Sequence, residues 1–293
     1  MKEWPRSLLF AGAYFALVFS QLAQNSEAED GKMSRTDTAT KLDTALRAAD
    51  SLRDSERQIS LFQSAADEAL KTMPANVLVE EAFQRVQKSM STDARKLAKE
   101  WRSALIEARD ILQFEPVKES PLPDGFPELT PVGEIRLQQY PKYRLARTDM
   151  TFMEGSAFWT LFNHIKERDI AMTAPVEMTY ADDGKTATKQ STMSFMYRST
   201  QQGQLGTAGK VQVVDIPAQM AVSIGIRGNA NKGRIADAKR RLESWLHVHR
   251  DEYESAGPLR VMGHNSPFIA EEKQFAEIQI PVCVKHSQRA VTP

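Results

Sequence analysis

Cysteine and net charge are both scarce in this chain. Cys283 is the only cysteine among 293 residues, which excludes an intramolecular disulfide and a metal cluster built from several cysteines. Lys and Arg together number 38, as do Asp and Glu, so the formal net charge is zero. A protein that binds nucleic acid through the phosphate backbone needs a basic face. The charge balance therefore argues against nucleic acid as a partner.

Common catalytic motifs are missing as well. The sequence has no Gly-x-Ser-x-Gly, no His-Glu-x-x-His and no glycine-rich loop of the kind that holds a phosphate. The lone cysteine has no partner that the sequence would place beside it. We therefore predict that the protein is not an enzyme, with no catalytic residues and no metal site.

One unbroken apolar run, Leu8 to Phe19, is typical of an export signal. Lys2 and Arg6 precede it, and Ser26-Glu27-Ala28 offers small residues at the two positions that a signal peptidase reads. A span needs about 20 apolar residues, and this run is shorter. We predict that residues 1–28 are a signal peptide cleaved after Ala28. The mature protein would then be periplasmic or secreted, with no stable membrane span; an uncleaved anchor is the alternative.

Residues 36–114 contain no glycine, and Pro74 is their only proline. Apolar residues recur here in steps of three and four, which places them on one side of a helix. Pro74 marks a break, and Ser91-Thr92-Asp93 can cap a later helix. We predict an α-helical hairpin or three-helix segment, whose charged sides are either solvated or dock a protein partner. The apolar positions include Leu42, Leu46, Ile59, Phe62, Leu97, Trp101 and Leu105.

Residues 115–132 are rich in proline and favour a linker or a wrapping segment. From residue 133 the pattern changes to short alternating strands around two helices. Extended segments hinged at Pro141 and again at Pro217 are each followed by a helix and two strands. The second half therefore repeats the order strand, helix, strand, strand. Such a duplication normally pairs its halves in one sheet or barrel with the helices outside.

Within the stretch "DIAMTAPVEMTY", residues 169–180, the alternation is strict from residue 172 to residue 180. Met172, Val176 and Met178 point to one side, while Glu177 points to the other. This pattern predicts a half-buried strand whose methionines fill either an ordinary core or an adaptable apolar pocket.

Four motifs resemble the SOUL / heme-binding-protein family over residues 133–284. They are "EIRLQQYPKYRLA" from residue 134, "FNHI" from residue 162, "IAMTAPVEM" from residue 170 and "MGHNSPF" from residue 262. The resemblance implies an α+β fold, a SOUL-type antiparallel barrel of two βαββ halves with two flanking helices, over residues 133–286. It also implies non-catalytic binding of heme or another flat tetrapyrrole.

Some family members carry a proposed heme-ligating histidine on the first strand, where this sequence has Leu137. His164 and His264 stand where many relatives have tyrosine, so each either ligates iron or replaces a tyrosine hydroxyl in a hydrogen bond. Affinity would then come mainly from apolar contact. The alternative is a structural protein whose barrel is a platform and whose helices dock a partner. The candidate ligand-binding residues are Met172, Val176, Met178, Phe195, Met262, His164 and His264.

Overall fold

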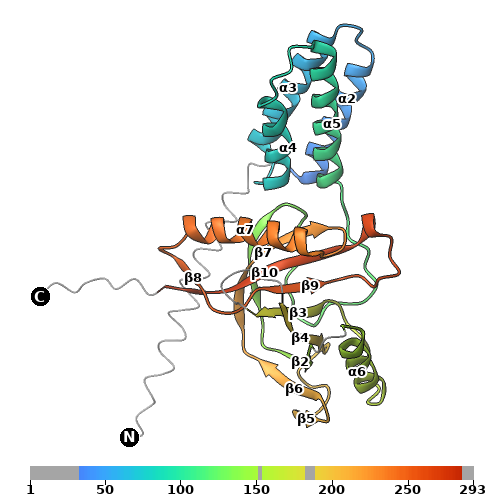
Figure 1. The fold of residues 1–293 in the computed structure, drawn as a ribbon, viewed down its shortest axis with the longest axis vertical. Coiled ribbons are helices and arrows are strands. Elements are labelled where there is room, and N and C mark those ends of the chain that lie inside the picture. Colours follow the sequence, from blue (N-terminus) through green and yellow to red (C-terminus); the bar gives the residue numbers. More distant parts are fainter. Residues whose placement is uncertain (1–32, 151–153, 182–188, 286–293) are drawn as a thin grey trace, which may run out of the picture. The chain divides into compact units, whose positions relative to one another are not determined.

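The computed structural model describes residues 33–150, 154–181 and 189–285. The chain divides into two compact units (Figure 1). The helical unit contains residues 33–75 and 79–113, and the sheet unit contains residues 76–78 and 114–285. The predicted signal peptide, residues 1–28, lies outside the described residues. Across the described part of the chain, none of the helices combines the length and the hydropathy needed to cross a membrane.

The helical unit has four helices in its described residues, where a hairpin or three helices were predicted. They are α2 (Arg35–Asp50), α3 (Ser55–Thr72), α4 (Val77–Gln87) and α5 (Ala94–Leu112). The extra break falls after Asp50, where Asp54 caps α3 by accepting hydrogen bonds from the backbone N–H groups of Glu56 and Arg57. A carboxylate at this position satisfies donors that the first turn of a helix leaves free. Asp93 caps α5 in the same way.

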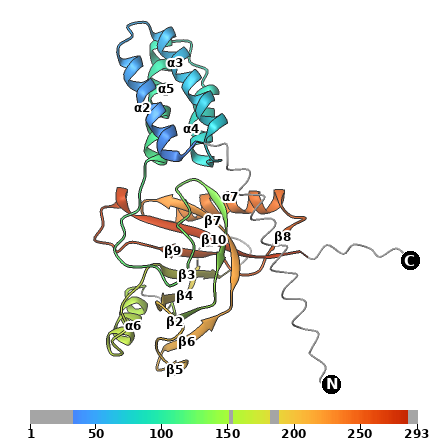
Figure 2. The same ribbon diagram turned by 180° about the vertical axis from the view of Figure 1, so that it is seen from behind.

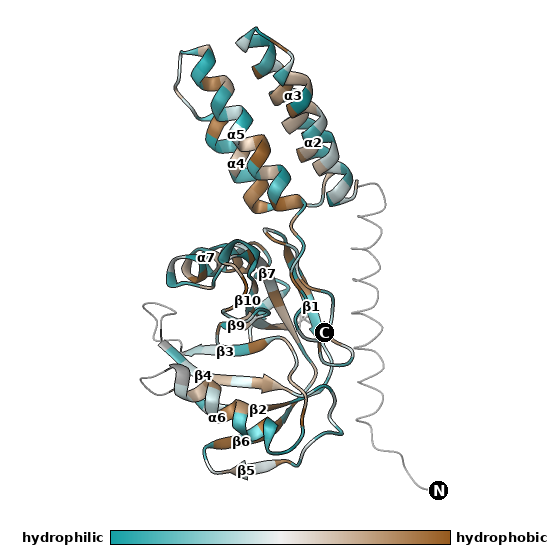
Figure 3. Cartoon of the chain, turned by 90° about the vertical axis from the view of Figure 1, so that its right-hand side faces the viewer, coloured by the Kyte–Doolittle hydropathy of each residue, from teal (hydrophilic) through white to brown (hydrophobic). Residues whose placement is uncertain are grey.

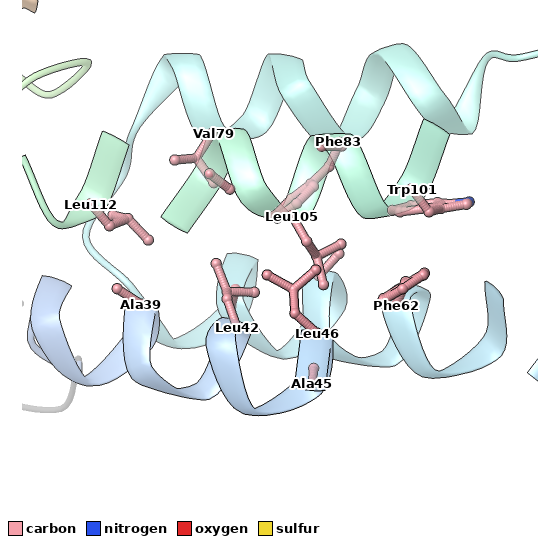
Figure 4. Packing of buried hydrophobic residues seen from close by; sticks show 14 of the residues in the cluster. Ala39, Leu42, Ala45, Leu46, Phe62, Val79, Phe83, Trp101, Leu105 and Leu112 are labelled. Atoms are coloured by element: carbon pink, nitrogen blue, oxygen red, sulfur yellow. The ribbon is translucent and has the colours of Figure 1, made fainter. Parts of the chain in front are cut away.

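The predicted apolar positions form the core of the helical unit. Leu42 and Leu46 of α2 point toward Leu105 of α5 (Figure 4). Phe62 and Trp101 are almost completely buried at the other end of this core. Burial of this stripe, together with the caps, explains why these residues form separate helices that pack side by side.

The sheet unit is built on one ten-stranded antiparallel sheet (Figure 2). Its strands run in the order β1-β7-β10-β9-β3-β4-β2-β6-β5, and β8 pairs with β10. Within the described residues β1 and β5 do not pair, so the sheet is not closed as a barrel. The strands are β1 (Ile135–Tyr140), β2 (Tyr143–Asp149), β3 (Val176–Ala181), β4 (Lys189–Met196), β5 (Gly206–Ala208), β6 (Val211–Ile216), β7 (Gln219–Arg227), β8 (Tyr253–Ser255), β9 (Arg260–Gly263) and β10 (Phe275–Val284).

The two predicted βαββ halves are β2-α6-β3-β4 and β7-α7-β9-β10, where α6 is Glu154–Lys166 and α7 is Lys232–Val248. At each of the two proline hinges, the strand before the proline pairs with the half that does not contain the strand after it. After β1 the chain turns at Pro141, so that β1 pairs with β7 while β2 pairs with β6. The chain turns again at Pro217, so that β6 pairs with β2 while β7 pairs with β1. The predicted α+β class and its duplication are confirmed.

Both helices cover the same side of the sheet, which we call the helix face. α7 packs on β7 and β10, with Ile235, Ala238 and Leu242 buried against Val222 and Ile278. α6 packs on β2 and β4 through Ala157, Leu161 and Ile165. Colouring by hydropathy shows hydrophobic and hydrophilic residues mixed along both the strands and α6 (Figure 3).

The Pro-rich segment, residues 115–132, runs over the opposite side of the sheet. Pro121 accepts a hydrogen bond from the backbone N–H of Ala174 at 3.0 Å, and Asp124 N–H donates to the backbone carbonyl of Arg198 at 2.8 Å. Thr130 N–H donates to the side chain of Glu277 at 2.9 Å. The side of β3 that carries Glu177 is therefore buried too, whereas a half-buried strand was predicted. The difference arises because this cover comes from a distant part of the chain.

Candidate functional site

An exposed aromatic surface lies on α6, the helix that covers β2 and β4. Phe158, Trp159 and Phe162 form the aromatic patch, with ring centroids 5.5–6.1 Å apart. Trp159 is 59% exposed, and the other two are half-buried. Their spacing puts them on one side of the helix, while Ala157 and Leu161 anchor it to the sheet. One exposed indole beside two half-buried phenyl rings thus gives α6 an apolar contact surface.

The layer beneath α6 contains three of the predicted ligand residues. Phe195 is buried and contacts Phe158 edge-on, with the two ring centroids 5.2 Å apart. Met172 and Val176 are half-buried and pack against the same cluster. The patch therefore continues into an apolar layer that includes a flexible methionine, a side chain suited to contacts of varied shape.

His164 is a buried residue of α6 itself, and its side chain already has a partner. Its Nε2 atom is 3.0 Å from the hydroxyl oxygen of Tyr197, and the residue is buried. Burial lowers the pKa of His164, which favours the neutral ring. The hydrogen-bonded role predicted as one alternative for this histidine matches this geometry. Binding to iron through Nε2 would require the tyrosine contact to break.

The opposite side of the sheet, which we call the polar face, carries a buried ion pair. Arg260 donates from Nη1 to Glu177 at 3.3 Å and to the Tyr143 hydroxyl at 3.1 Å, and from Nε to Gln279 at 2.9 Å. Its guanidinium also lies 4.9 Å from the centroid of the Tyr140 ring. Burial raises the pKa of Glu177, opposed by Arg260, and raises that of Tyr143 to about 12.

A second buried pair on the polar face fixes the Pro-rich segment. His264 Nε2 lies 2.9 Å from Glu277 Oε2, while Glu277 Oε1 accepts from Thr130 N–H at 2.9 Å and from Ser223 at 3.2 Å. Burial would raise the pKa of Glu277, but the hydrogen bonds from His264 and Thr130 outweigh it and hold the pKa below its usual value. The ionised carboxylate is thus the form that ties residue 130 to the sheet.

The depressed pKa of Glu277 predicts a pH dependence of stability. A carboxylate whose folded pKa lies below its unfolded value contributes stability above the unfolded value, about 4.3, and loses it as the pH falls through the folded pKa. In urea titrations between pH 7 and pH 3, the stability advantage of the wild type over Glu277→Gln should shrink below about pH 4.3. The exposed Glu272→Gln is the control and should show no such convergence. A pH-independent difference for Glu277→Gln would contradict the assignment.

The seven predicted ligand residues fall on both sides of the sheet. Met172, Val176 and Phe195 lie under α6, His164 is a buried residue of α6, and Met178 contacts the clusters beneath both helices. Met262 and His264 belong to the polar face, where Met262 stands in register between Glu177 and Glu277. The structure thus brings five of the seven together at α6. Ligand contact by any of them stays a prediction.

Sequence reasoning missed the polar face. Arg260, Glu277 and Gln279 interrupt apolar strands and were not among the candidates. One pattern could have found two of them, because Glu277 and Gln279 alternate with apolar residues in "FAEIQIPV", from residue 275, which places both on one side of β10. No group of three or more His, Cys, Asp or Glu side chains able to hold a metal occurs in the described part of the chain.

The duplicated βαββ sheet with two helices on one face places the sheet unit in the α+β class. The chain belongs to the SOUL heme-binding protein family, whose model matches residues 129–281. The four motifs quoted above all lie within the matched region, and the recognition from sequence is confirmed. No curated protein matches the chain.

Several solved structures are similar to part of the chain at low identity. EcmrR in its DNA complex is 17% identical, with 51% of this chain and 57% of that chain covered and a TM-score of 0.41. A hydrolase from Listeria innocua is 11% identical, with 53% and 94% covered and a TM-score of 0.41. SAV2435 bound to tetraphenylphosphonium is 13% identical, with 51% and 94% covered and a TM-score of 0.34. The chain thus spans little more than half of the EcmrR chain. Scores this low carry no functional argument.

Proposed function

We propose that the sheet unit binds heme or another tetrapyrrole at the aromatic patch of α6, without catalysing a reaction on it. Family membership supports the ligand class. The observation that carries the location is the exposed Trp159, flanked by Phe158 and Phe162, above a layer containing Met172 and Val176. Aromatic side chains supply large contact areas for the face of a flat macrocycle.

The patch fits the macrocycle better than it fits the iron. Lys166 is exposed at the end of α6, where an ammonium group can pair with a propionate. His164 is the histidine of this helix, but its Nε2 atom contacts Tyr197. When bound, the group would supply a redox-active or light-absorbing centre, while the protein contributes apolar contact and orientation.

Binding should therefore be nearly independent of iron. We expect metal-free and zinc protoporphyrin to bind within about tenfold of hemin, a difference of roughly 1.4 kcal/mol. His164→Phe and His264→Phe should shift hemin affinity by no more than that, because apolar contact supplies most of the free energy. Titration followed by the Soret band for hemin, and by fluorescence for the iron-free rings, measures these affinities.

The location is tested by Trp159→Ala, which removes an exposed side chain and should leave the fold intact. We expect this substitution to weaken the binding of hemin, zinc protoporphyrin and metal-free protoporphyrin by at least about tenfold. Phe268→Ala is the matched control, since Phe268 is another exposed aromatic residue on the sheet unit, 94% exposed in the loop after β9, and its loss should change nothing. The proposal fails if Soret changes are unsaturable, or if Trp159→Ala binds as the wild type does. Loss of hemin but not protoporphyrin binding in one histidine variant would establish axial ligation instead.

A further inference from the structure

The Pro-rich segment inserts one aromatic ring into the polar face. Pro123 to Phe126 form a tight turn, in which Phe126 N–H donates to the Pro123 carbonyl and Gly125 has φ +77°. The Phe126 ring stands edge-on to the rings of Tyr140 and Tyr143. The centroid distances are 5.1 Å and 5.2 Å, and the interplanar angles are 78° and 82°. The residue is only half-buried. A four-residue turn at the surface thus fills an aromatic niche made by two strands.

Beside this niche lies a hydrogen-bond donor without an acceptor. Arg260 is 3% exposed, and its Nη2 atom has no hydrogen-bond partner among the described residues. The same guanidinium covers the Tyr140 ring that Phe126 contacts. An unpaired buried donor costs free energy that an added acceptor recovers. Because Glu177 already faces Arg260, a ligand needs to bring an oxygen acceptor there but no charge.

We propose that this part of the polar face is a binding site for a small, neutral aromatic molecule with a carbonyl oxygen, such as an aryl ketone. Its ring would lie between Tyr140 and Tyr143, and its oxygen would accept a hydrogen bond from Arg260 Nη2. In the free protein Phe126 occupies the place of that ring. The site is on the opposite side of the sheet from the aromatic patch of α6, and it does not depend on tetrapyrrole binding.

Phe126 competes with the ligand in this arrangement. The turn is held by the hydrogen bond from Asp124 N–H to Arg198 and by the exposed Asp124–Arg198 ion pair at 3.2 Å. A ligand binds only to molecules in which the turn has moved away, and this reduces its apparent affinity by the fraction that is open. Removing the ring removes the competitor and leaves the two tyrosines in place.

The test uses acetophenone and ethylbenzene, which differ by the carbonyl oxygen. Titrated into the full chain and followed by protein NMR, acetophenone should bind Phe126→Ala at least tenfold more tightly than it binds the wild type. It should also bind this variant at least tenfold more tightly than ethylbenzene does. Phe126→Leu, which keeps an apolar side chain, should fall between the wild type and the alanine variant. It also serves as the second variant if Phe126→Ala does not fold.

Two controls make the outcome decisive. Phe158→Ala removes another half-buried phenylalanine, from the helix face, and should not gain acetophenone binding. Adding Arg260→Met and Glu177→Gln to Phe126→Ala removes both charges together, so that neither remains unpaired, and should abolish the preference for acetophenone over ethylbenzene.

Equal binding of the two probes, or equal affinity of the wild type and Phe126→Ala, would overturn the proposal. Tighter binding of benzylamine than of acetophenone would also overturn it, because the site would then recruit a cation through Glu177. Trp159→Ala should leave acetophenone binding unchanged, which separates this site from the tetrapyrrole proposal.

Discussion

Replacing Arg260 by methionine is expected to lower the free energy of unfolding by about 3–5 kcal/mol. Methionine fills much of the arginine volume but removes the charge that faces Glu177 and the donors to Tyr143 and Gln279. The carboxyl group of Glu177, a residue that is 6% exposed, is then left buried without its counter-charge. Urea unfolding at pH 7, with the wild type measured in parallel, gives the difference in free energy.

The double variant Arg260→Met with Glu177→Gln separates charge from packing. Because a neutral amide costs less to bury than an uncompensated carboxylate, the double variant should recover a substantial part of the loss. If the double variant is as unstable as the single one, the contacts of the guanidinium with Tyr140 and Gln279 outweigh its pairing with Glu177. A loss below about 1 kcal/mol in the single variant would contradict the buried ion pair altogether.

The second large effect is expected for Gly225→Ala on β7, at about 3 kcal/mol. A Cβ atom at residue 225 would lie 2.2 Å from the carbonyl oxygen of Thr130 and 2.7 Å from that of Pro131. Both are backbone atoms, and residue 225 also accepts a hydrogen bond from Gly133 N–H at 3.0 Å. The Pro-rich segment would have to lift from the sheet to admit a methyl group. Thermal and urea unfolding measure the cost.

Gly233→Ala is the matched control for that substitution. Gly233 lies in the first turn of α7, where the nearest atom to an added Cβ is the side-chain oxygen of Asn231 at 3.4 Å. Alanine restricts the unfolded chain and favours helix, so this variant should be unchanged or more stable by up to about 1 kcal/mol. If Gly225→Ala proves equally mild, the close packing of residues 130–131 on β7 is not present in solution.

The sequence by itself determined the elements and their repetition. Helical spacing of Leu42, Phe62 and Trp101 located the apolar stripe of the helical unit, because the helical period of 3.6 residues does not depend on how the helix packs. Alternation predicted a strand over residues 172–180, of which the structure has β3 from Val176 onward. The positions of Pro141 and Pro217 located the hinges, because proline cannot continue a hydrogen-bonded ladder. The motifs around residues 170–178 and 262–268 were sufficient for the family.

Only the tertiary structure decided what covers each side of a strand. Met172 and Met262 look alike in sequence, yet the first packs under α6 and the second lies on the polar face. Alternation assigns a residue to one of two sides but does not say what covers that side. The burial of Glu177 and Glu277 depends on the Pro-rich segment and on partners such as Arg260, which are far away in sequence. Such contacts come from chain topology, and no local period of the sequence encodes them.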